Sequence, residues 1–176
     1  MPHAPYSVAP DVLRLLGARA ARPGAVCSIH VGESADELEF LHTGRGRWRD
    51  VLDARGAWNP HWTPPACGPV EYLDRLGVVG PSLLAVHCVQ CTDAELARLA
   101  AARATIVTCP RSNLWVGAGS PPAARFFASG ARARLVTVDL PSGVKDVEAH
   151  LVEGVHPSQV AWAVWDAHGQ RETYVS

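Results

Sequence analysis

Apolar residues in this chain gather in short runs that alternate with amphipathic segments. Runs at 25–30, 82–89 and 104–109 have the length and composition of buried strands. Amphipathic helices are predicted at the following segments: 10–22, a helix opening at Ser34, 70–76, 92–103 and 122–129. Ser34 and Thr92 each stand three residues before a glutamate, which is the capping-box pattern of a helix start. The alternation of strands and helices predicts an α/β fold with a parallel sheet and right-handed crossovers.

Two stretches depart from this alternation. Residues 43–69 are rich in Gly, Pro and Trp, and we expect a long loop there, either a functional lid or a disordered segment. Beyond Gly130 the pattern becomes strand-like at 133–139, and 160–175 has the pattern of a β-hairpin that turns at Asp166–Gly169. We therefore expect an α/β unit over 1–130 and a small antiparallel β unit over 131–176.

Composition narrows the function classes. The chain has 176 residues, of which 48% are hydrophobic and 19% charged, which suits one globular domain with a substantial core. A net charge of −1 gives no electrostatic reason to expect binding to nucleic acid or to an anionic membrane. No apolar run reaches the length of a membrane span. Cys27, Cys88 and Cys109 lie in apolar runs, so we expect buried thiols and a cytoplasmic protein.

Two histidines stand where predicted strands end. His30 closes the first run and is followed three residues later by Glu33, and His87 closes the second. In α/β enzymes, polar residues at the carboxyl ends of parallel strands carry the chemistry. Imidazoles bind zinc or iron, and a nearby carboxylate can move protons. The alternatives are a solvated His–Glu pair and, for His87, a histidine satisfied within the core.

Three further patterns have competing interpretations. Cys88-Val-Gln-Cys91 resembles a redox motif, but Cys88 lies within the strand rather than at a helix start, which disfavours that function. Tryptophans in the segment 43–69 could form the wall of a pocket for a planar ring or simply pack the segment against the body. Asn113, just after the third strand, could orient a ligand or serve the turn.

A series of motifs in one order resembles the amidohydrolase superfamily. The motifs are His3-Ala-Pro-Tyr6, His30-x-x-Glu33, Pro69-Val-Glu-Tyr-Leu-Asp-Arg-Leu-Gly77, Ala85-Val-His87-Cys88-Val89 and Cys109-Pro-Arg-Ser-Asn113. They are most similar to the cytosine-deaminase-like branch, which contains the S-adenosylhomocysteine/methylthioadenosine deaminases, the aminodeoxyfutalosine deaminases and the triazine chlorohydrolases. The resemblance covers residues 2–130.

The resemblance implies a fold and a set of roles. The family fold is a TIM (β/α)8 barrel with a small β-sandwich, and residues 1–130 match an incomplete barrel, about strands five to seven. By resemblance His30 is a metal ligand, Glu33 moves protons and His87 polarises the attacking water. His3 and Asn113 would contact a small heterocyclic substrate. One zinc or iron ion would activate the water, which attacks a ring carbon and expels ammonia or another leaving group.

The sequence also departs from the family pattern. The H-x-H metal pair of strand one is missing, and so is the Gly-Thr-Asp-Ser-type sequence of strand eight. Asp139 could replace the strand-eight aspartate, but we assign 133–139 to the sandwich instead. We therefore expect a truncated chain that is inactive alone, acting as a homo-oligomer or with a complementing chain. The alternative is a non-catalytic module that binds a ligand or a partner.

Overall fold

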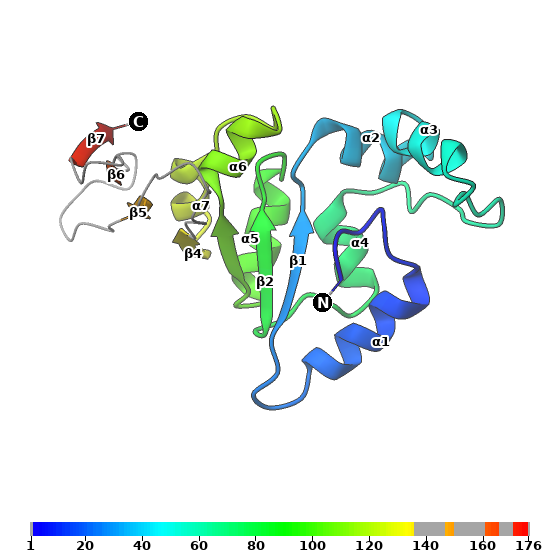
Figure 1. The fold of residues 1–176 in the computed structure, drawn as a ribbon. Helices are drawn as coiled ribbons and strands as arrows, with labels where there is room; N and C mark the ends of the chain where they lie inside the picture. The colour runs from blue at the N-terminus through cyan, green and yellow to red at the C-terminus, as the bar shows by residue number, and fades with distance from the viewer. Residues whose placement is uncertain (1, 136–146, 150–160, 166–170, 176) are drawn as a thin grey trace.

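The computed structural model describes residues 2–135, 147–149, 161–165 and 171–175. Its centre is a sheet of four parallel strands in the order β1-β2-β3-β4 (Figure 1). The strands are β1 (Cys27–Val31), β2 (Leu83–His87), β3 (Thr105–Thr108) and β4 (Arg132–Leu135). Each strand pairs with the next one along the chain, so the α/β fold with a parallel sheet is confirmed.

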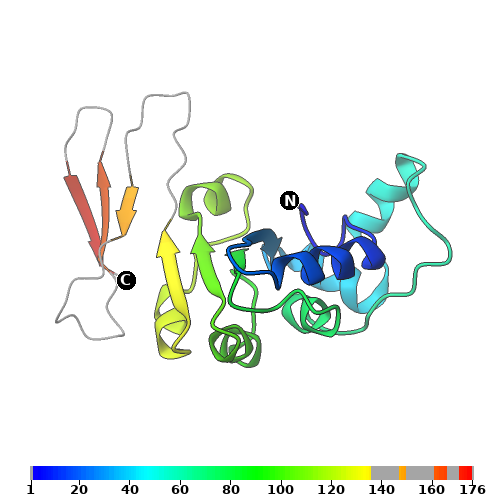
Figure 2. The same cartoon turned by 90° about the horizontal axis from the view of Figure 1, so that it is seen from below.

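Alternation along the strands separates two faces of the sheet. Ile29, Ala85 and Ile106 occupy one row of the pairing register, and all three are fully buried. They belong to a core that also includes side chains from α1 (Pro10–Ala20), α2 (Ala35–Thr43), α4 (Pro69–Arg75), α5 (Asp93–Ala101) and α7 (Ala123–Ala128). Figure 2 shows α4, α5 and α7 along one side of the sheet. Ser28 and His30 point to the opposite face and are only half-buried, whereas Val86 and Val107, in register with His30 on that face, are buried.

The helices are α1 (Pro10–Ala20), α2 (Ala35–Thr43), α3 (Arg47–Ala54), α4 (Pro69–Arg75), α5 (Asp93–Ala101), α6 (Pro110–Trp115) and α7 (Ala123–Ala128). Five of them begin close to where the sequence predicts, whereas α3 and α6 lie where it predicts no helix. The Thr92–Glu95 capping box is complete, with both reciprocal hydrogen bonds present. The Ser34 side chain accepts the amide of Glu37, but the Glu37 carboxylate is used elsewhere. None of the described helices is long and apolar enough to cross a lipid bilayer.

Glu95 joins two helix starts. Its Oε2 accepts the Thr92 amide at the start of α5, and its Oε1 accepts the Val70 amide at the start of α4, both at 3.0 Å. A methyl group on Gly68 would lie 2.3 Å from Oε1, so this position tolerates no side chain in the present packing. The carboxylate is buried at a point where two helix dipoles present their positive ends. It therefore fixes α4 and α5 relative to each other.

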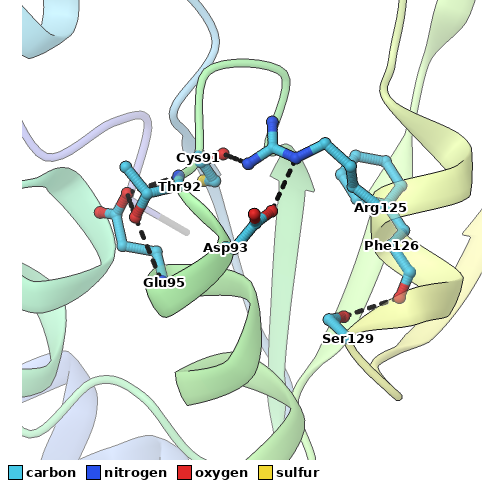
Figure 3. A network of polar contacts seen from close by, with 7 residues as sticks. All are labelled: Cys91, Thr92, Asp93, Glu95, Arg125, Phe126 and Ser129. Atoms are coloured by element: carbon cyan, nitrogen blue, oxygen red, sulfur yellow. Dashed lines mark hydrogen bonds and ion pairs between the residues drawn. The ribbon is translucent and has the colours of Figure 1, made fainter.

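A second polar contact ties α7 to the start of α5. The Arg125 guanidinium donates to Asp93 at 2.7 Å and to the Cys91 carbonyl oxygen at 2.8 Å (Figure 3). At the end of α7, the Ser129 hydroxyl donates to the Phe126 carbonyl oxygen. Cys91 belongs to the connection between β2 and α5. The connection that follows His87 is thus held both by Arg125 and by the Thr92–Glu95 capping box.

The expected long loop over 43–69 contains a helix, α3, and so the expectation of an irregular segment is wrong for residues 47–54. Aromatic packing accounts for much of its order. Trp62 stacks on Phe40 of α2 with 4.8 Å between ring centroids, and Trp58 meets both rings edge-on. The Arg49 guanidinium lies 3.8 Å from the Trp58 ring centroid. These tryptophans pack the segment against α2, as one of the two interpretations predicts.

The boundary expected at residue 130 does not coincide with an edge of the sheet. β4 lies beyond it, yet pairs in parallel with β3 over Arg132–Leu135. Asp139 lies outside the described residues. Strands β5 (Val147–Ala149), β6 (Ala161–Trp165) and β7 (Arg171–Val175) form an antiparallel sheet in the order β5-β6-β7. The pairing of β6 with β7 confirms the two arms of the predicted hairpin, and the turn between them is outside the described part of the chain.

Candidate functional site

The carboxyl ends of β1 and β2 bring together three of the residues singled out in the sequence. His30 and His87 meet edge-on with 4.7 Å between ring centroids. Glu33, in the turn between β1 and α2, places Oε1 3.4 Å from His87 Nε2. One ligating atom from each of the three side chains lies within 4.8 Å of the others. We call His30, Glu33 and His87 the strand-end cluster.

His87 reaches this cluster through an unusual backbone conformation. In the pairing register His87 lies opposite Val31, whose side chain is buried on the helix-covered face. Regular alternation would send the His87 ring to that face as well. Instead His87 has φ = 77°, and Cys88 has φ = 53°, both in the left-handed region. Such residues are uncommon outside glycine and cost free energy. The turn of the backbone accounts for the ring facing His30, on the face opposite the buried Val31 side chain.

Glu37 shapes the turn that carries Glu33, a role that the sequence analysis did not foresee. Its carboxylate is fully buried and accepts the amides of Gly32 at 3.1 Å and Glu33 at 3.0 Å. Burial raises the pKa of this carboxyl to about 7, although the two amide hydrogen bonds oppose the shift. In the sequence, Glu37 stands at the third position of α2, where a glutamate usually caps the start of its own helix. Here it holds the preceding strand-to-helix turn.

The raised pKa of Glu37 predicts that stability falls as the pH rises from about 4.5 to about 7, because the unfolded chain ionises first. Below this window Glu37 is protonated in both the folded and the unfolded chain. Above it the loss of folding free energy is constant, on the order of 3 kcal/mol. Urea unfolding at about pH 5 and about pH 8 measures the change. In Glu37→Gln this part of the pH dependence should vanish. In Glu39→Gln, an exposed position on the same helix, it should persist. An unchanged pH profile in Glu37→Gln would contradict the assignment.

Asn113 contacts the cluster from α6. It is fully buried, and its Oδ1 lies 2.6 Å from His87 Nδ1. Its Nδ2 and the Nε2 of His87 are both buried without a hydrogen-bond partner in the described part of the chain. Buried polar atoms of this kind usually have partners, so each points to a group that binds there. Asn113, for which the sequence predicts a contact with substrate, thus lies against His87, and its carbonyl oxygen faces His87 Nδ1.

His3 flanks the cluster on the other side. The carbonyl oxygen of His3 accepts the His30 amide at 2.9 Å, so the N-terminal segment runs beside β1. The exposed His3 ring has its centroid 5.1 Å from that of His30. Tyr6 stacks on Trp48 of α3 at 4.2 Å, and burial, together with the charges of Glu37 and Glu33, raises the pKa of its hydroxyl. Segment 2–6 thus contacts both His30 and α3.

The strand-end cluster fits a divalent metal ion. Two imidazoles and a carboxylate are a donor set used by zinc enzymes, which hold the metal with three protein ligands and keep one position open. The 3.4 Å between His87 Nε2 and Glu33 Oε1 is close to the roughly 3.3 Å ligand spacing of a tetrahedral zinc site. Burial lowers the pKa of His30, with the neighbouring His87 adding to the shift, which keeps its ring neutral and able to bind a metal. His87 Nε2, which has no hydrogen-bond partner within residues 2–135, completes the fit.

Among the described residues, no cysteine belongs to this donor set. All five are free thiols, and Cys88 and Cys91 are buried. A hydrogen bond with Cys88 is the main cause that raises the pKa of the Cys91 thiol well above its usual value, and burial is the second. Redox-active thiols have a lowered pKa instead. The buried thiols expected at Cys27 and Cys88 are confirmed, while Cys109 is only partly buried. The arrangement thus speaks against a redox function for the C-x-x-C sequence.

Comparison with known sequences gives one family. Residues 1–145 match the amidohydrolase family. The chain is 37% identical over 150 residues to an aminodeoxyfutalosine deaminase from Deinococcus radiodurans, covering 81% of this chain and 35% of that protein. It is 35% identical over 136 residues to a 5-methylthioadenosine/S-adenosylhomocysteine deaminase from Pelotomaculum thermopropionicum, covering 77% of this chain and 27% of that one. The chain thus spans about a third or less of the length of these relatives.

Comparison with solved structures agrees with the sequences. An adenosine deaminase from Xanthomonas campestris, determined with bound zinc, superposes with a TM-score of 0.58 at 28% identity. The match covers 76% of this chain and 26% of that one. An atrazine chlorohydrolase from Arthrobacter aurescens, complexed with zinc, has a TM-score of 0.56 at 18% identity, over 74% of this chain and 24% of the other. The second likeness shows a shared fold.

Proposed function

Because the chain belongs to the amidohydrolase family, we propose that it serves in the metal-dependent hydrolytic deamination of a small heterocyclic compound. The observation that carries this proposal is the strand-end cluster, in which His30, Glu33 and His87 converge and one buried imidazole nitrogen has no hydrogen-bond partner among the described residues. The relatives named after deamination favour an adenosine derivative as the first substrate class to test.

In this reaction the residues of the chain have separate tasks. Hydrolytic deamination adds water to a ring carbon and releases ammonia, so a group must take a proton from water and deliver one to the leaving nitrogen. Glu33 is a partly exposed member of the cluster and can do both. His87 is buried and held in place, and it would polarise the attacking water. A divalent ion, when bound, supplies the Lewis acidity that lowers the pKa of water.

His30 would hold that ion, with His87 Nε2 and the Glu33 carboxylate within reach. Zinc and iron remain the two candidate metals, and two of the structural relatives contain zinc. His3 lies beside His30 and would contact the substrate from segment 2–6. Asn113 would contact the substrate through Nδ2, the amide atom that has no partner among the described residues.

We also propose that the parallel sheet is part of a TIM (β/α)8 barrel, about strands five to seven, with a C-terminal piece of the family's β-sandwich. The inward face of such a barrel would be the face of Ser28 and His30, where the side chains are only half-buried. A barrel of this kind typically takes ~250 residues. Further ligands would come from the remaining strands, supplied by another part of the barrel or by a complementing chain.

The chain alone is expected to bind zinc weakly and to release no ammonia. The strand-end cluster offers three donor groups, and Glu33 cannot serve fully as a ligand and as a proton carrier at once. Metal analysis after dialysis and an ammonia assay with 5'-methylthioadenosine, S-adenosylhomocysteine and guanine test this. Stoichiometric zinc that survives a chelator would contradict the expectation of weak binding.

The deaminase proposal itself is tested by a transplanted segment. Residues 1–145 of this chain would replace the matching segment of the Deinococcus aminodeoxyfutalosine deaminase. The hybrid is expected to release ammonia from the substrate of that enzyme, and the same hybrid with Glu33→Gln is expected to stay near background. A hybrid that folds and binds zinc, yet releases no ammonia, would overturn the proposed function.

A further inference from the structure

Asn113 is a polar residue in an environment that normally excludes one. Its side chain is 0% exposed, at the centre of the short helix α6, where the following residues Leu114 and Trp115 are strongly exposed. Burying an amide costs free energy unless it is hydrogen-bonded. The hydrogen bond that its carbonyl oxygen makes is the 2.6 Å contact with His87 Nδ1. The placement of Asn113 is therefore specific to the imidazole that it contacts.

This contact decides where the His87 ring carries its proton. A neutral imidazole has one N–H and one lone pair, and the partner of one nitrogen sets the state of the other. The Asn113 carbonyl oxygen can only accept, so Nδ1 must donate. Nε2 then carries the lone pair and faces Glu33. If the amide were turned round, Nδ2 would donate to Nδ1 and the proton would move to Nε2, which gives two distinguishable states.

The backbone at His87 increases the need for such a partner. With φ = 77° the ring leaves the face that its place in the strand dictates, and no regular strand geometry orients it. The contact with Asn113 connects the end of β2 to α6, two elements separated by α5 and β3 along the chain. An amide also differs from a carboxylate in being uncharged, so it orients the imidazole without favouring the protonated ring.

We propose that Asn113 is a positioning residue that fixes His87 in the tautomer with its proton on Nδ1, so that Nε2 presents its lone pair to His30 and Glu33. The role in catalysis rests on the proposed function. The tautomer is a property of the chain itself and can be measured without metal or substrate. In metal sites the same logic holds, since a second hydrogen bond to a histidine fixes its tautomer and raises its basicity as a ligand.

The test is nuclear magnetic resonance of the protein labelled with 15N-histidine. Long-range 1H–15N correlations at alkaline pH, where the rings are neutral, distinguish the two tautomers. The signals of His87 are assigned by their loss in His87→Gln. We expect the wild-type ring to carry its proton on Nδ1. A proton on Nε2 in the wild type would overturn the proposal.

Two substitutions of Asn113 extend the test. Asn113→Leu keeps the shape but removes the acceptor, so the His87 ring should shift towards the tautomer with its proton on Nε2, and zinc affinity should fall about 10–100-fold. Asn113→Asp retains the acceptor and should keep the proton on Nδ1. Leu114→Ala, at an exposed position of the same helix, should change neither readout. An unchanged tautomer in a folded Asn113→Leu protein would refute the role of Asn113.

The proposal can still be tested if Asn113→Leu fails to fold or if the transplanted segment is inactive. If Asn113→Leu does not fold, the wild-type protein and Asn113→Asp still decide, because a proton on Nε2 in either contradicts the proposal. If the transplanted segment releases no ammonia but His87 shows the expected tautomer, the proposed function fails while the positioning role of Asn113 stands. The two conclusions are therefore tested separately.

Discussion

His30→Ala is expected to lower the zinc affinity of the chain by more than about 100-fold. Removing a residue that only hydrogen-bonds a metal ligand already lowers metal affinity about 10–100-fold, and removing the ligand itself should cost more. His30 is the half-buried imidazole at the centre of the site, with the rings of His3 and His87 on either side. Its lowered pKa means that little proton competition opposes metal binding near neutral pH. Titration with zinc against a fluorescent chelator measures the affinity before and after the substitution.

The matched control for this experiment is His42→Ala. His42 is an exposed histidine in α2 and lies outside the strand-end cluster. Removing it takes away one imidazole without touching the site, so zinc affinity should stay within about twofold of the wild type. An equal loss in both variants would mean that zinc binds to surface histidines, and the metal-site assignment would then be wrong.

The largest effect on stability is expected from Glu95→Ala. The substitution leaves the Val70 and Thr92 amides without their acceptor at two helix starts. Each lost cap costs about 1 kcal/mol, and a buried amide left unpaired costs about 1–3 kcal/mol. We expect the free energy of unfolding to fall by about 3–4 kcal/mol, a large share of the roughly 5–15 kcal/mol of a typical domain. The urea midpoint at an unchanged slope measures this loss.

Glu71→Ala provides the comparison. Glu71 lies in α4 and makes an exposed ion pair with Arg75 one turn away, at 2.6 Å. Exposed pairs of this kind contribute about 0.3–0.5 kcal/mol. A loss in Glu95→Ala no larger than that in Glu71→Ala would show that the helix starts find other partners, and that Glu95 does not connect α4 with α5.

The parallel sheet could be predicted because its signals are local. Apolar runs followed by capping residues gave the strands and helix starts to within a few residues, and the Thr92–Glu95 box forms as its sequence predicts. The helix within 43–69 has no such local signal, since the segment is ordered by the stacking of Trp62 on Phe40 of α2 and by the contact of Arg49 with Trp58. The strand after Gly130 was assigned to a sandwich, but hydrogen bonds to β3 place Arg132–Leu135 in the parallel sheet.

Three of the residues singled out in the sequence lie close together in the structure, but the sequence does not predict their geometry. Position at strand ends was enough to pair His30 with His87, yet the alternation of side chains would have separated them. The left-handed backbone at His87, which no residue type signals, brings the rings together. Glu37 was expected to cap its own helix, and its use by the Gly32 and Glu33 amides depends on the fold of the preceding turn.

The N-terminal segment has a practical consequence for anyone who purifies this protein. The backbone of His3 is hydrogen-bonded to His30, and its ring lies 5.1 Å from the His30 ring. A polyhistidine affinity tag fused ahead of residue 1 would therefore place extra imidazoles within a few residues of the strand-end cluster. Such a tag would compete for zinc and add its own resonances to the histidine spectra. Protein for the metal and resonance experiments should carry a tag that contains no histidine, or one that a protease removes before measurement.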